Sequence, residues 1–259
     1  MSLEDPRAQY RQLADLLRAA IERGDYPAGS RFPSEPELAE RHGVGRLTVN
    51  KAVSILRSQG LVRVERGRGT IVRELPLLLI RESVGRQRPG TRDAGEARGA
   101  FQAEMERLGL AARSEVDVSE VASPEDVAEL LAIGGGEPVL ARRRRMFAND
   151  VPVQLATSYL PLDVAAGTPI AETDTGPGGT YSRLAELGHA PAVFRESVRV
   201  RPADEGEARF FRMDADQRVM VIRRVARTAT GRIIEVNDMV LPAHQWALEY
   251  EWDAEPAGG

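Results

Sequence analysis

The sequence contains no cysteine and only three histidines among its 259 residues. Without cysteine the chain can form no disulfide, iron–sulfur cluster, cysteine-ligated zinc site or thiol nucleophile. His42, His189 and His244 lie far apart and form no HExxH-type pair, so a histidine-rich metal site is not expected either. We therefore predict that the protein holds neither a metal nor a cofactor.

Long apolar runs are missing as well. The run Leu77–Ile80 has four residues, whereas a membrane-spanning helix needs about 20. Glu4 and Asp5 open the chain in place of the basic and apolar segments of a secretory signal. The composition, with 42% hydrophobic and 29% charged residues, is that of a soluble globular protein. We expect one large or two small domains, no membrane association and a cytoplasmic location.

The formal net charge of −4 is unevenly distributed along the chain. Residues 1–74 carry 13 basic and 10 acidic side chains, whereas residues 101–259 carry 17 basic and 26 acidic ones. A basic segment in an otherwise acidic protein indicates contact with nucleic acid. Because the excess is small, the motifs of this segment have to decide the question.

The first 74 residues show the order helix, helix, helix, hairpin. Apolar residues within 10–21 follow the spacing of an amphipathic helix, and Ser34 with Glu37 forms a capping box that starts a second helix. A third helix is predicted over 47–59 after a short glycine-containing turn, which gives a helix-turn-helix pattern. Two short strands within 61–72 flank a glycine-rich basic tip. This order predicts a winged helix-turn-helix.

The outward face of the third helix is suited to DNA. In the major groove arginine pairs bidentately with guanine and asparagine with adenine, roles that Arg46 and Asn50 can take. Ser34, Thr48 and Lys51 can bind phosphates, which fix the position of the protein rather than the sequence it reads.

The wing offers a second contact with DNA. Its tip contains Arg66, Gly67 and Arg68, and glycine allows a close approach to the backbone or the minor groove. The alternative interpretation is that the polar residues of helix and wing are simply solvated on a small domain.

Several motifs stand close together within residues 7–73. They are Tyr10-x-Gln12-Leu13-Ala14, Gly29-x-Arg31-Phe32-Pro33-Ser34-Glu35, Glu37-Leu38-Ala39, Gly43-Val44-x-Arg46-x-Thr48-Val49 and Gly67-x-Gly69-Thr70. With them the segment resembles the GntR family of bacterial transcription regulators, which implies DNA contacts by Arg46, Thr48 and Gly67. Pro36 and Asn50 stand where the family usually has arginine, so the resemblance implies no particular operator sequence.

Residues 76–100 separate the basic segment from the rest of the chain. Glycine, proline and arginine punctuate this polar stretch, which we interpret as a linker. The predicted domains are therefore a winged helix-turn-helix over 1–75, the linker over 76–100 and a second domain over 101–253.

The second domain contains a weak internal repeat. In each copy a helix-like segment precedes two strands joined by a turn. The copies end at Pro161 and Pro242, and Gln154 and Glu235 occupy equivalent positions seven residues before these prolines. Two copies of a helix and an antiparallel hairpin predict an α+β domain around one antiparallel sheet.

Four consecutive arginines, 142–145, lie in a predicted strand of this domain. Alternation places Arg143 and Arg145 on one face of the sheet and Arg142 and Arg144 on the other. Two arginines on an interior face are costly unless an anion or carboxylates match them, and a ligand phosphate or carboxylate would bind them bidentately. The alternative is that acidic residues of this domain pair with them or that they lie in water.

A second set of motifs lies within residues 100–250. They are Phe101-x-x-Glu104-Met105, Pro138-Val139 leading to Arg143-x-Arg145, Tyr159-Leu160-Pro161, Gly179-Thr180-Tyr181 and Val236-Asn237-Asp238-Met239-Val240-Leu241-Pro242. With them the domain resembles the UTRA effector domain of the HutC branch of GntR regulators, in its actinomycete form, which is similar in fold to chorismate lyase. The resemblance implies a homodimer and a small-molecule effector, with Arg143, Arg145 and Tyr181 among its ligands. Glu235 and Asn237 share a strand face and can bind hydroxyl or amine groups of the effector.

Together these observations predict a DNA-binding transcriptional regulator. We expect a homodimeric repressor with a palindromic double-stranded DNA operator, modulated by a small anionic metabolite. One alternative is a chorismate lyase-like enzyme fused to a DNA-binding module, although the sequence has no cysteine nucleophile, clustered histidines, GxSxG motif or P-loop, and so no candidate catalytic residue. Another is a plasmid-transfer repressor that binds no ligand.

Overall fold

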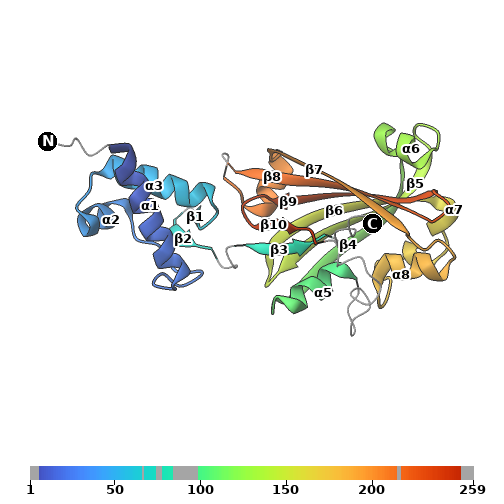
Figure 1. Ribbon diagram of the computed structural model, residues 1–259, viewed down its shortest axis with the longest axis horizontal. Helices are drawn as coiled ribbons and strands as arrows, with labels where there is room; N and C mark the ends of the chain where they lie inside the picture. Colours follow the sequence, from blue (N-terminus) through green and yellow to red (C-terminus); the bar gives the residue numbers. More distant parts are fainter. Residues whose placement is uncertain (1–5, 66, 74–77, 84–98, 215–216, 252–259) are drawn as a thin grey trace, which may run out of the picture. The chain divides into compact units, whose positions relative to one another are not determined.

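The computed structural model describes residues 6–65, 67–73, 78–83, 99–214 and 217–251 (Figure 1). The chain divides into two compact units. The first consists of Met1–Leu79, Pro202–Arg218 and Ala243–Gln245, and the second of Ile80–Arg201, Val219–Pro242 and Trp246–Gly259. The predicted α+β class, with helices and an antiparallel sheet, is confirmed.

The first unit contains the winged helix predicted from the sequence. Its elements are α1 (Pro6–Glu22), α2 (Glu35–His42), α3 (Arg46–Ser58), β1 (Val62–Glu65), β2 (Gly69–Val72) and, from far along the chain, α9 (Glu205–Phe211). The apolar stripes of α1, α2 and α3 meet in one core around Leu17, Leu38 and Leu56. Strands β1 and β2 pair antiparallel and form the wing.

Local signals set the helix boundaries. The capping box of α2 is present, with the Ser34 backbone N donating to Glu37 Oε2 at 2.7 Å. Gly43 ends α2 at φ 62°, a left-handed conformation in which glycine carries no Cβ penalty. The tight turn between α2 and α3 follows directly from this stop.

The C-terminal end of α3 is held by residues that lie far along the sequence. Gln217 Nε2 donates to the carbonyl oxygen of Arg57 at 2.7 Å, and Arg57 Nη2 pairs with Asp214 Oδ1 at 3.0 Å. Gly60 packs against His244 so closely that a Cβ built on Gly60 would lie 1.9 Å from His244 Cδ2. These contacts explain why 202–218 and 243–245 belong to the first unit.

The half-buried His244, whose two ring nitrogens are enclosed, makes this unit sensitive to acid. Burial, aided by the positive charge of Arg73, lowers the pKa of His244 from 6.5 to about 3. The unfolded chain takes up this proton near pH 6.5 and the folded protein only near pH 3, so the free energy of unfolding falls as the pH decreases through this window. We expect about 2 kcal/mol of this fall by pH 5.

Urea unfolding at about pH 7 and about pH 5 tests this prediction. His244→Leu fills the site with an apolar side chain that cannot titrate. Its free energy of unfolding is therefore expected to change less between the two pH values than that of the wild type. An equal change in both proteins would contradict the assignment.

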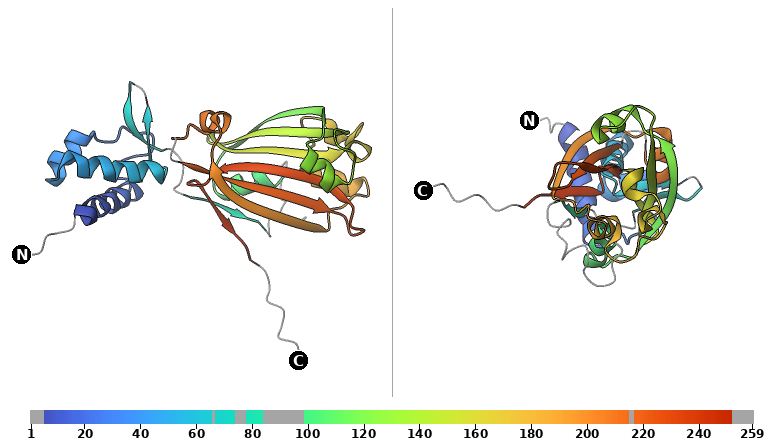
Figure 2. Two further views of the ribbon diagram at one scale, coloured as in Figure 1. Left: turned by 90° about the horizontal axis from the view of Figure 1, so that it is seen from above. Right: turned by 90° about the vertical axis from the view of Figure 1, so that its right-hand side faces the viewer.

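The second domain is built on one six-stranded sheet of order β4-β5-β6-β9-β8-β7 (Figures 1 and 2). The strands are β4 (Ala112–Ala122), β5 (Pro138–Ala148), β6 (Val151–Pro161), β7 (Val193–Pro202), β8 (Arg218–Arg227) and β9 (Ile233–Pro242). The helices are α5 (Ala100–Arg107), α6 (Glu125–Leu131), α7 (Leu162–Ala165), the 3-10 helix η2 (Pro169–Ala171) and α8 (Gly179–Glu186). The strand order is symmetric about the β6–β9 pair.

The internal repeat explains this symmetry. Each copy contributes a strand, a helix and a hairpin: β4, α6, β5 and β6 in the first, and β7, α9, β8 and β9 in the second. The copies meet where Ser158 pairs with Asn237. Asn149 and Asp150, at φ 46° and 62°, form the turn of the first hairpin.

Helices cover both faces of the sheet. Val127 and Leu131 of α6 pack with Val139 and Val236 on one face. On the other face, α7, η2 and α8 pack against Leu140 and Leu160 near one end of the strands. The rest of that second face borders the cavity described below.

The segment interpreted as a linker contains a strand. Residues Leu79–Glu82 form β3, which pairs with β10 (Trp246–Glu249). Leu79 and Arg81 are buried, and Leu79 N donates to the Gln245 carbonyl oxygen at 2.7 Å. This part of the linker interpretation is therefore wrong, because Leu79 and Ile80 belong to a strand whose partner lies far away in sequence. Residues 74–77 and 84–98 lie outside the described residues.

Within the described ranges, no helix combines the length and the apolar character needed to cross a membrane.

Candidate nucleic-acid interface and effector cavity

The outward face of α3 carries the side chains that the sequence predicted. Arg46, Asn50 and Lys51 are exposed, and Leu47 between them is 68% exposed. Arg46 has no ion pair within the described part of the chain. An unneutralised arginine at the start of an exposed helix can engage a base edge or a phosphate.

Three of the other predicted DNA contacts already have partners. The Ser34 hydroxyl donates to Glu37 Oε2 at 2.6 Å, and the Lys51 ammonium lies 5.7 Å from the centre of the Tyr10 ring. Asn50 Nδ2 donates to Glu35 Oε1 at 2.9 Å. Thr48 is half-buried. These side chains therefore surround the N-terminal part of α3 together with Arg46.

At the tip of the wing, the described residues include the cation Arg68. Arg68 is exposed and pairs with Glu65 at 2.7 Å, and Gly67 adopts φ 82°, which only glycine tolerates without strain. Arg66 lies outside the described residues.

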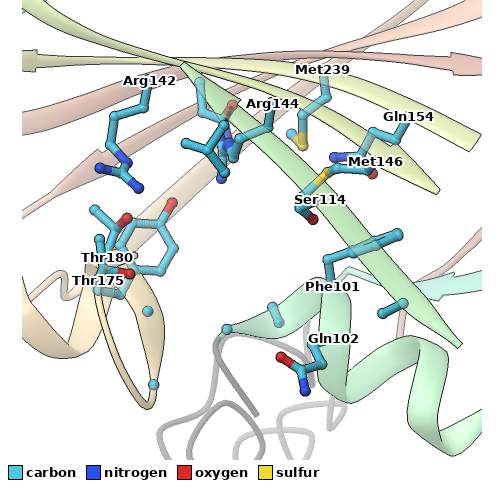
Figure 3. Close-up of a pocket in the computed structure, with 18 of the residues that line it drawn as sticks. Phe101, Gln102, Ser114, Arg142, Arg144, Met146, Gln154, Thr175, Thr180 and Met239 are labelled. Atoms are coloured by element: carbon cyan, nitrogen blue, oxygen red, sulfur yellow. Dashed lines mark hydrogen bonds between the residues drawn. The ribbon is translucent and has the colours of Figure 1, made fainter. Parts of the chain in front are cut away.

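A cavity of about 550 Å³ lies against the sheet face that α8 partly covers (Figure 3). Its polar lining comprises Arg81, Gln102, Ser114, Arg142, Arg144, Gln154, Thr173, Asp174, Thr175, Thr180, Tyr181, Arg224, Glu235 and Asn237. Arg142 lies beside Thr175 and Thr180 in Figure 3, while Met146, Gln154 and Phe101 lie toward the other end. The cavity thus has a strongly polar end and a more apolar one.

The structure places the two pairs of arginines of this strand on opposite faces of the sheet. Alternation along β5 is confirmed, but Arg142 and Arg144 line this cavity, whereas Arg143 and Arg145 are exposed on the opposite face. Arg143 pairs there with Asp117 of β4 at 3.2 Å, the kind of partner that the sequence left open as an alternative. The physical reason is the position of the core: even-numbered residues of β5, such as Leu140, pack toward α7 and α8.

The two cavity arginines differ in how their donors are used. Arg142 donates to the backbone carbonyls of Ile170, Glu172 and Thr173, so it holds the segment that follows η2. Burial, aided by the charge of Arg144, lowers the pKa of Arg142 to about 10. Arg142 therefore shapes the cavity, and only its Nε and part of its Nη2 stay without a partner among the described residues.

Some of the N–H donors of Arg144 have no hydrogen-bond partner among the described residues. Its Nη2 donates to Ser158 Oγ at 2.6 Å and to Asn237 Oδ1 at 3.2 Å. Its Nε is buried and has no partner among the described residues, and its Nη1 has none there either. Burial lowers its pKa, and Glu235 and Tyr181 oppose this shift. Arg144 as a whole is half-buried, and a guanidinium with free donors on a cavity wall has the chemistry to bind an anion.

Tyr181 and Glu235, both predicted as effector ligands, line the cavity, but they form a hydrogen bond with each other. The Tyr181 hydroxyl donates to Glu235 Oε2, and burial next to this carboxylate raises the pKa of Tyr181. Glu235 is therefore engaged, which leaves Asn237 beside Arg144 as the more available of the polar side chains on β9.

Sequence reasoning missed Gln154 as a site residue. It is 3% exposed, lines the cavity, and its Oε1 has no partner among the described residues. A buried acceptor without a donor is costly, which indicates a place for a ligand N–H or O–H. Its repeat equivalence with Glu235 is the sequence signal that could have identified this position.

Glu196 neutralises the other two arginines that line the cavity. Arg81 Nη2 and Arg224 Nε each donate to Glu196 Oε1 at 2.8 Å. Burial alone would raise the pKa of Glu196, but Arg224 and Arg81 outweigh it and lower this pKa to about 2. Glu196 is thus committed to this pair, and neither Arg142 nor Arg144 has a direct carboxylate partner among the described residues.

Comparison with known proteins identifies the family. Residues 9–72 match the family of bacterial regulatory proteins of the gntR type, and residues 105–246 match the UTRA domain. The chain belongs to the GntR family of transcriptional regulators. It is 30% identical to the HTH-type transcriptional regulator SCO4628 of Streptomyces coelicolor, over 95% of this chain and 94% of that protein. The predicted resemblance is therefore confirmed in both domains.

Other relatives agree with this assignment. The chain is 25% identical to the HTH-type transcriptional repressor NagR of Bacillus subtilis, over 96% of this chain and 97% of that protein. The crystal structure of PhnF from Mycobacterium smegmatis has the same fold, with a TM-score of 0.57 and 23% identity over 95% of this chain and 100% of that one. This member of the GntR family thus combines a DNA-binding winged helix with a UTRA domain that binds small-molecule effectors.

Proposed function

We propose that this GntR regulator is a homodimeric repressor that leaves a palindromic operator when a small anionic metabolite binds the Arg144 cavity. In this proposal residues 1–75 bind DNA and residues 101–253 bind the effector, in the cytoplasm and without turnover of the effector. Arg144 carries the proposal, because its free donors in a buried site favour an anion over a neutral ligand. That a relative is named a repressor supports the direction of control.

The proposed anion has further donors around it. Gly178, Gly179 and Thr180 line the cavity at the start of α8, where backbone N–H groups and the helix dipole favour negative charge. A phosphate or carboxylate placed between this helix start and Arg144 would be bound from two sides. Met146 and Phe101 at the other end would contact an apolar part of the ligand, and Gln154 would accept one of its N–H or O–H groups.

A metabolite screen tests the effector site. Thermal melting of the full chain with phosphorylated sugars and carboxylic acids is expected to identify stabilising ligands, and the same ligands are expected to release DNA. A protein stabilised only by neutral compounds would contradict an anion site. A stabilising compound consumed by the protein would favour the lyase alternative, and DNA binding unaffected by any stabilising compound would favour the regulator without an effector.

Two substitutions on α3 separate base reading from phosphate contact. Arg46→Ala is expected to cost about 1–3 kcal/mol of operator binding and to relax one base position. Lys51→Ala is expected to weaken all DNA sequences about equally and to reduce the salt dependence of binding, because a phosphate contact carries no sequence information. Fluorescence anisotropy with specific and random duplexes at several salt concentrations measures both effects.

The same titrations can also contradict this prediction. An equal loss of specificity in both variants would show that these roles are wrongly divided between Arg46 and Lys51.

The dimer is tested independently. A symmetric pair of recognition helices about one turn of DNA apart requires a palindromic site. Sedimentation is expected to show a dimer at working concentration, and a single half-site is expected to bind weakly. A monomer that binds one half-site with full affinity would contradict the proposal.

A further inference from the structure

Asn50, exposed on α3, is held by a residue of the neighbouring helix. Its Nδ2 donates to Oε1 of Glu35, the first residue of α2, at 2.9 Å. A carboxylate only accepts hydrogen bonds, so the amide must turn its nitrogen toward Glu35. One N–H of Asn50 is used in this contact, and the second N–H and Oδ1 have no partner among the described residues.

This orientation has a consequence for base recognition. Adenine presents N7 as an acceptor next to the N6 amino donor in the major groove, which matches the free N–H and Oδ1 of Asn50. Guanine presents two acceptors, N7 and O6, and the fixed Oδ1 faces one of them. Thymine and cytosine each offer one partner group for this pair of atoms.

We propose that Glu35 is a positioning residue that fixes the Asn50 amide for bidentate contact with an adenine of the operator. The proposal rests on the placement of α3 in the major groove. Glu35 itself touches no base; it acts through Asn50, and Asn50 becomes a specificity-determining residue for adenine over guanine.

The surroundings of Glu35 support this role. Glu35 is partly buried and forms no ion pair in the described part of the chain. A carboxylate near DNA phosphates weakens binding electrostatically. A gain in specificity would offset this loss of affinity. Orienting Asn50, which lies one helical turn after Arg46 on the same exposed face, supplies this gain.

The first test uses the unmodified protein. The full chain selects binding sites from a randomised duplex library, and each adenine of the consensus is then replaced by 7-deazaadenine, which keeps base pairing and N6 but lacks N7. At one adenine per half-site we expect roughly a 10- to 100-fold loss of affinity. The same replacement is expected to have little effect on Asn50→Ala, which has already lost the contact.

The second test separates positioning from charge. Glu35→Ala is expected to lose most of the preference for adenine over guanine at that position, and Glu35→Gln to keep it, because an amide oxygen still accepts from Asn50. Glu40→Ala is the control, since it removes an exposed negative charge of the same helix without touching Asn50. It is expected to raise affinity for all sequences slightly and to leave the preference unchanged.

Three results would overturn the inference. One is a consensus with no adenine whose 7-deaza replacement is silent in Asn50→Ala; another is an unchanged preference in a folded Glu35→Ala protein, judged by its melting temperature. The third, failure to select any sequence, would contradict major-groove reading by α3 itself, whereas the first two leave DNA binding and the proposed repressor intact.

Discussion

Replacing Gly60 by alanine is expected to destabilise the first unit by about 2–4 kcal/mol. Gly60 adopts φ 72°, where an L side chain is strained by about 1 kcal/mol. The added Cβ would also lie 1.9 Å from Cδ2 of the His244 ring, closer than any real contact, so the buried ring or the backbone must move. Overpacking of this kind typically costs a further 1–3 kcal/mol, roughly.

Gly24→Ala is the matched control for the strain alone. Gly24 has φ 83° but nothing within 4 Å of its built Cβ, so only the conformational cost of about 1 kcal/mol is expected. Combining Gly60→Ala with His244→Ala is expected to cost less than the sum of the two single changes, because removing the ring makes room for the methyl group. Urea unfolding of the four proteins measures these differences. Equal losses for Gly24→Ala and Gly60→Ala would show that the contact is unimportant.

The winged helix could be predicted from sequence because its signals are local. The capping box at Ser34, the apolar stripe around Val53 and the glycine-rich wing each lie within a few residues of the element they specify. Parts that depend on distant contacts were not predictable. Strand β3 needs β10, and Gln217 caps α3 from far along the chain.

The arginine strand shows the same limit inside the effector site. Period-2 alternation defines two faces but does not say which one is covered. That choice depends on where α7 and α8 pack, and they lie over Leu140 on the face of Arg144. Glu235, Asn237 and Tyr181 were placed in the cavity from the sequence, but the contact between Tyr181 and Glu235 depends on how α8 folds over the sheet.

Arg144→Ala is expected to weaken the effector response by more than about 100-fold. An anionic ligand would remain buried in the cavity without its cation, and an unpaired buried charge costs several kcal/mol. Operator affinity is expected to stay close to that of the wild type, because Arg144 lies in the second unit and the residues proposed to read DNA lie in the first. DNA release measured by fluorescence anisotropy, with the metabolite found in the melting screen, gives both quantities.

Arg145→Ala is the control, since it removes the same charge from the same strand on the opposite, exposed face. It is expected to keep the full effector response. A response lost in Arg145→Ala and kept in Arg144→Ala would restore the face that the sequence resemblance implied and place the site outside the cavity. Loss of effector response and DNA binding together, with a lowered melting temperature in Arg144→Ala, would mean that the contacts of Arg144 with Ser158 and Asn237 hold the sheet together. Only an intact operator affinity combined with a lost response assigns Arg144 to the ligand.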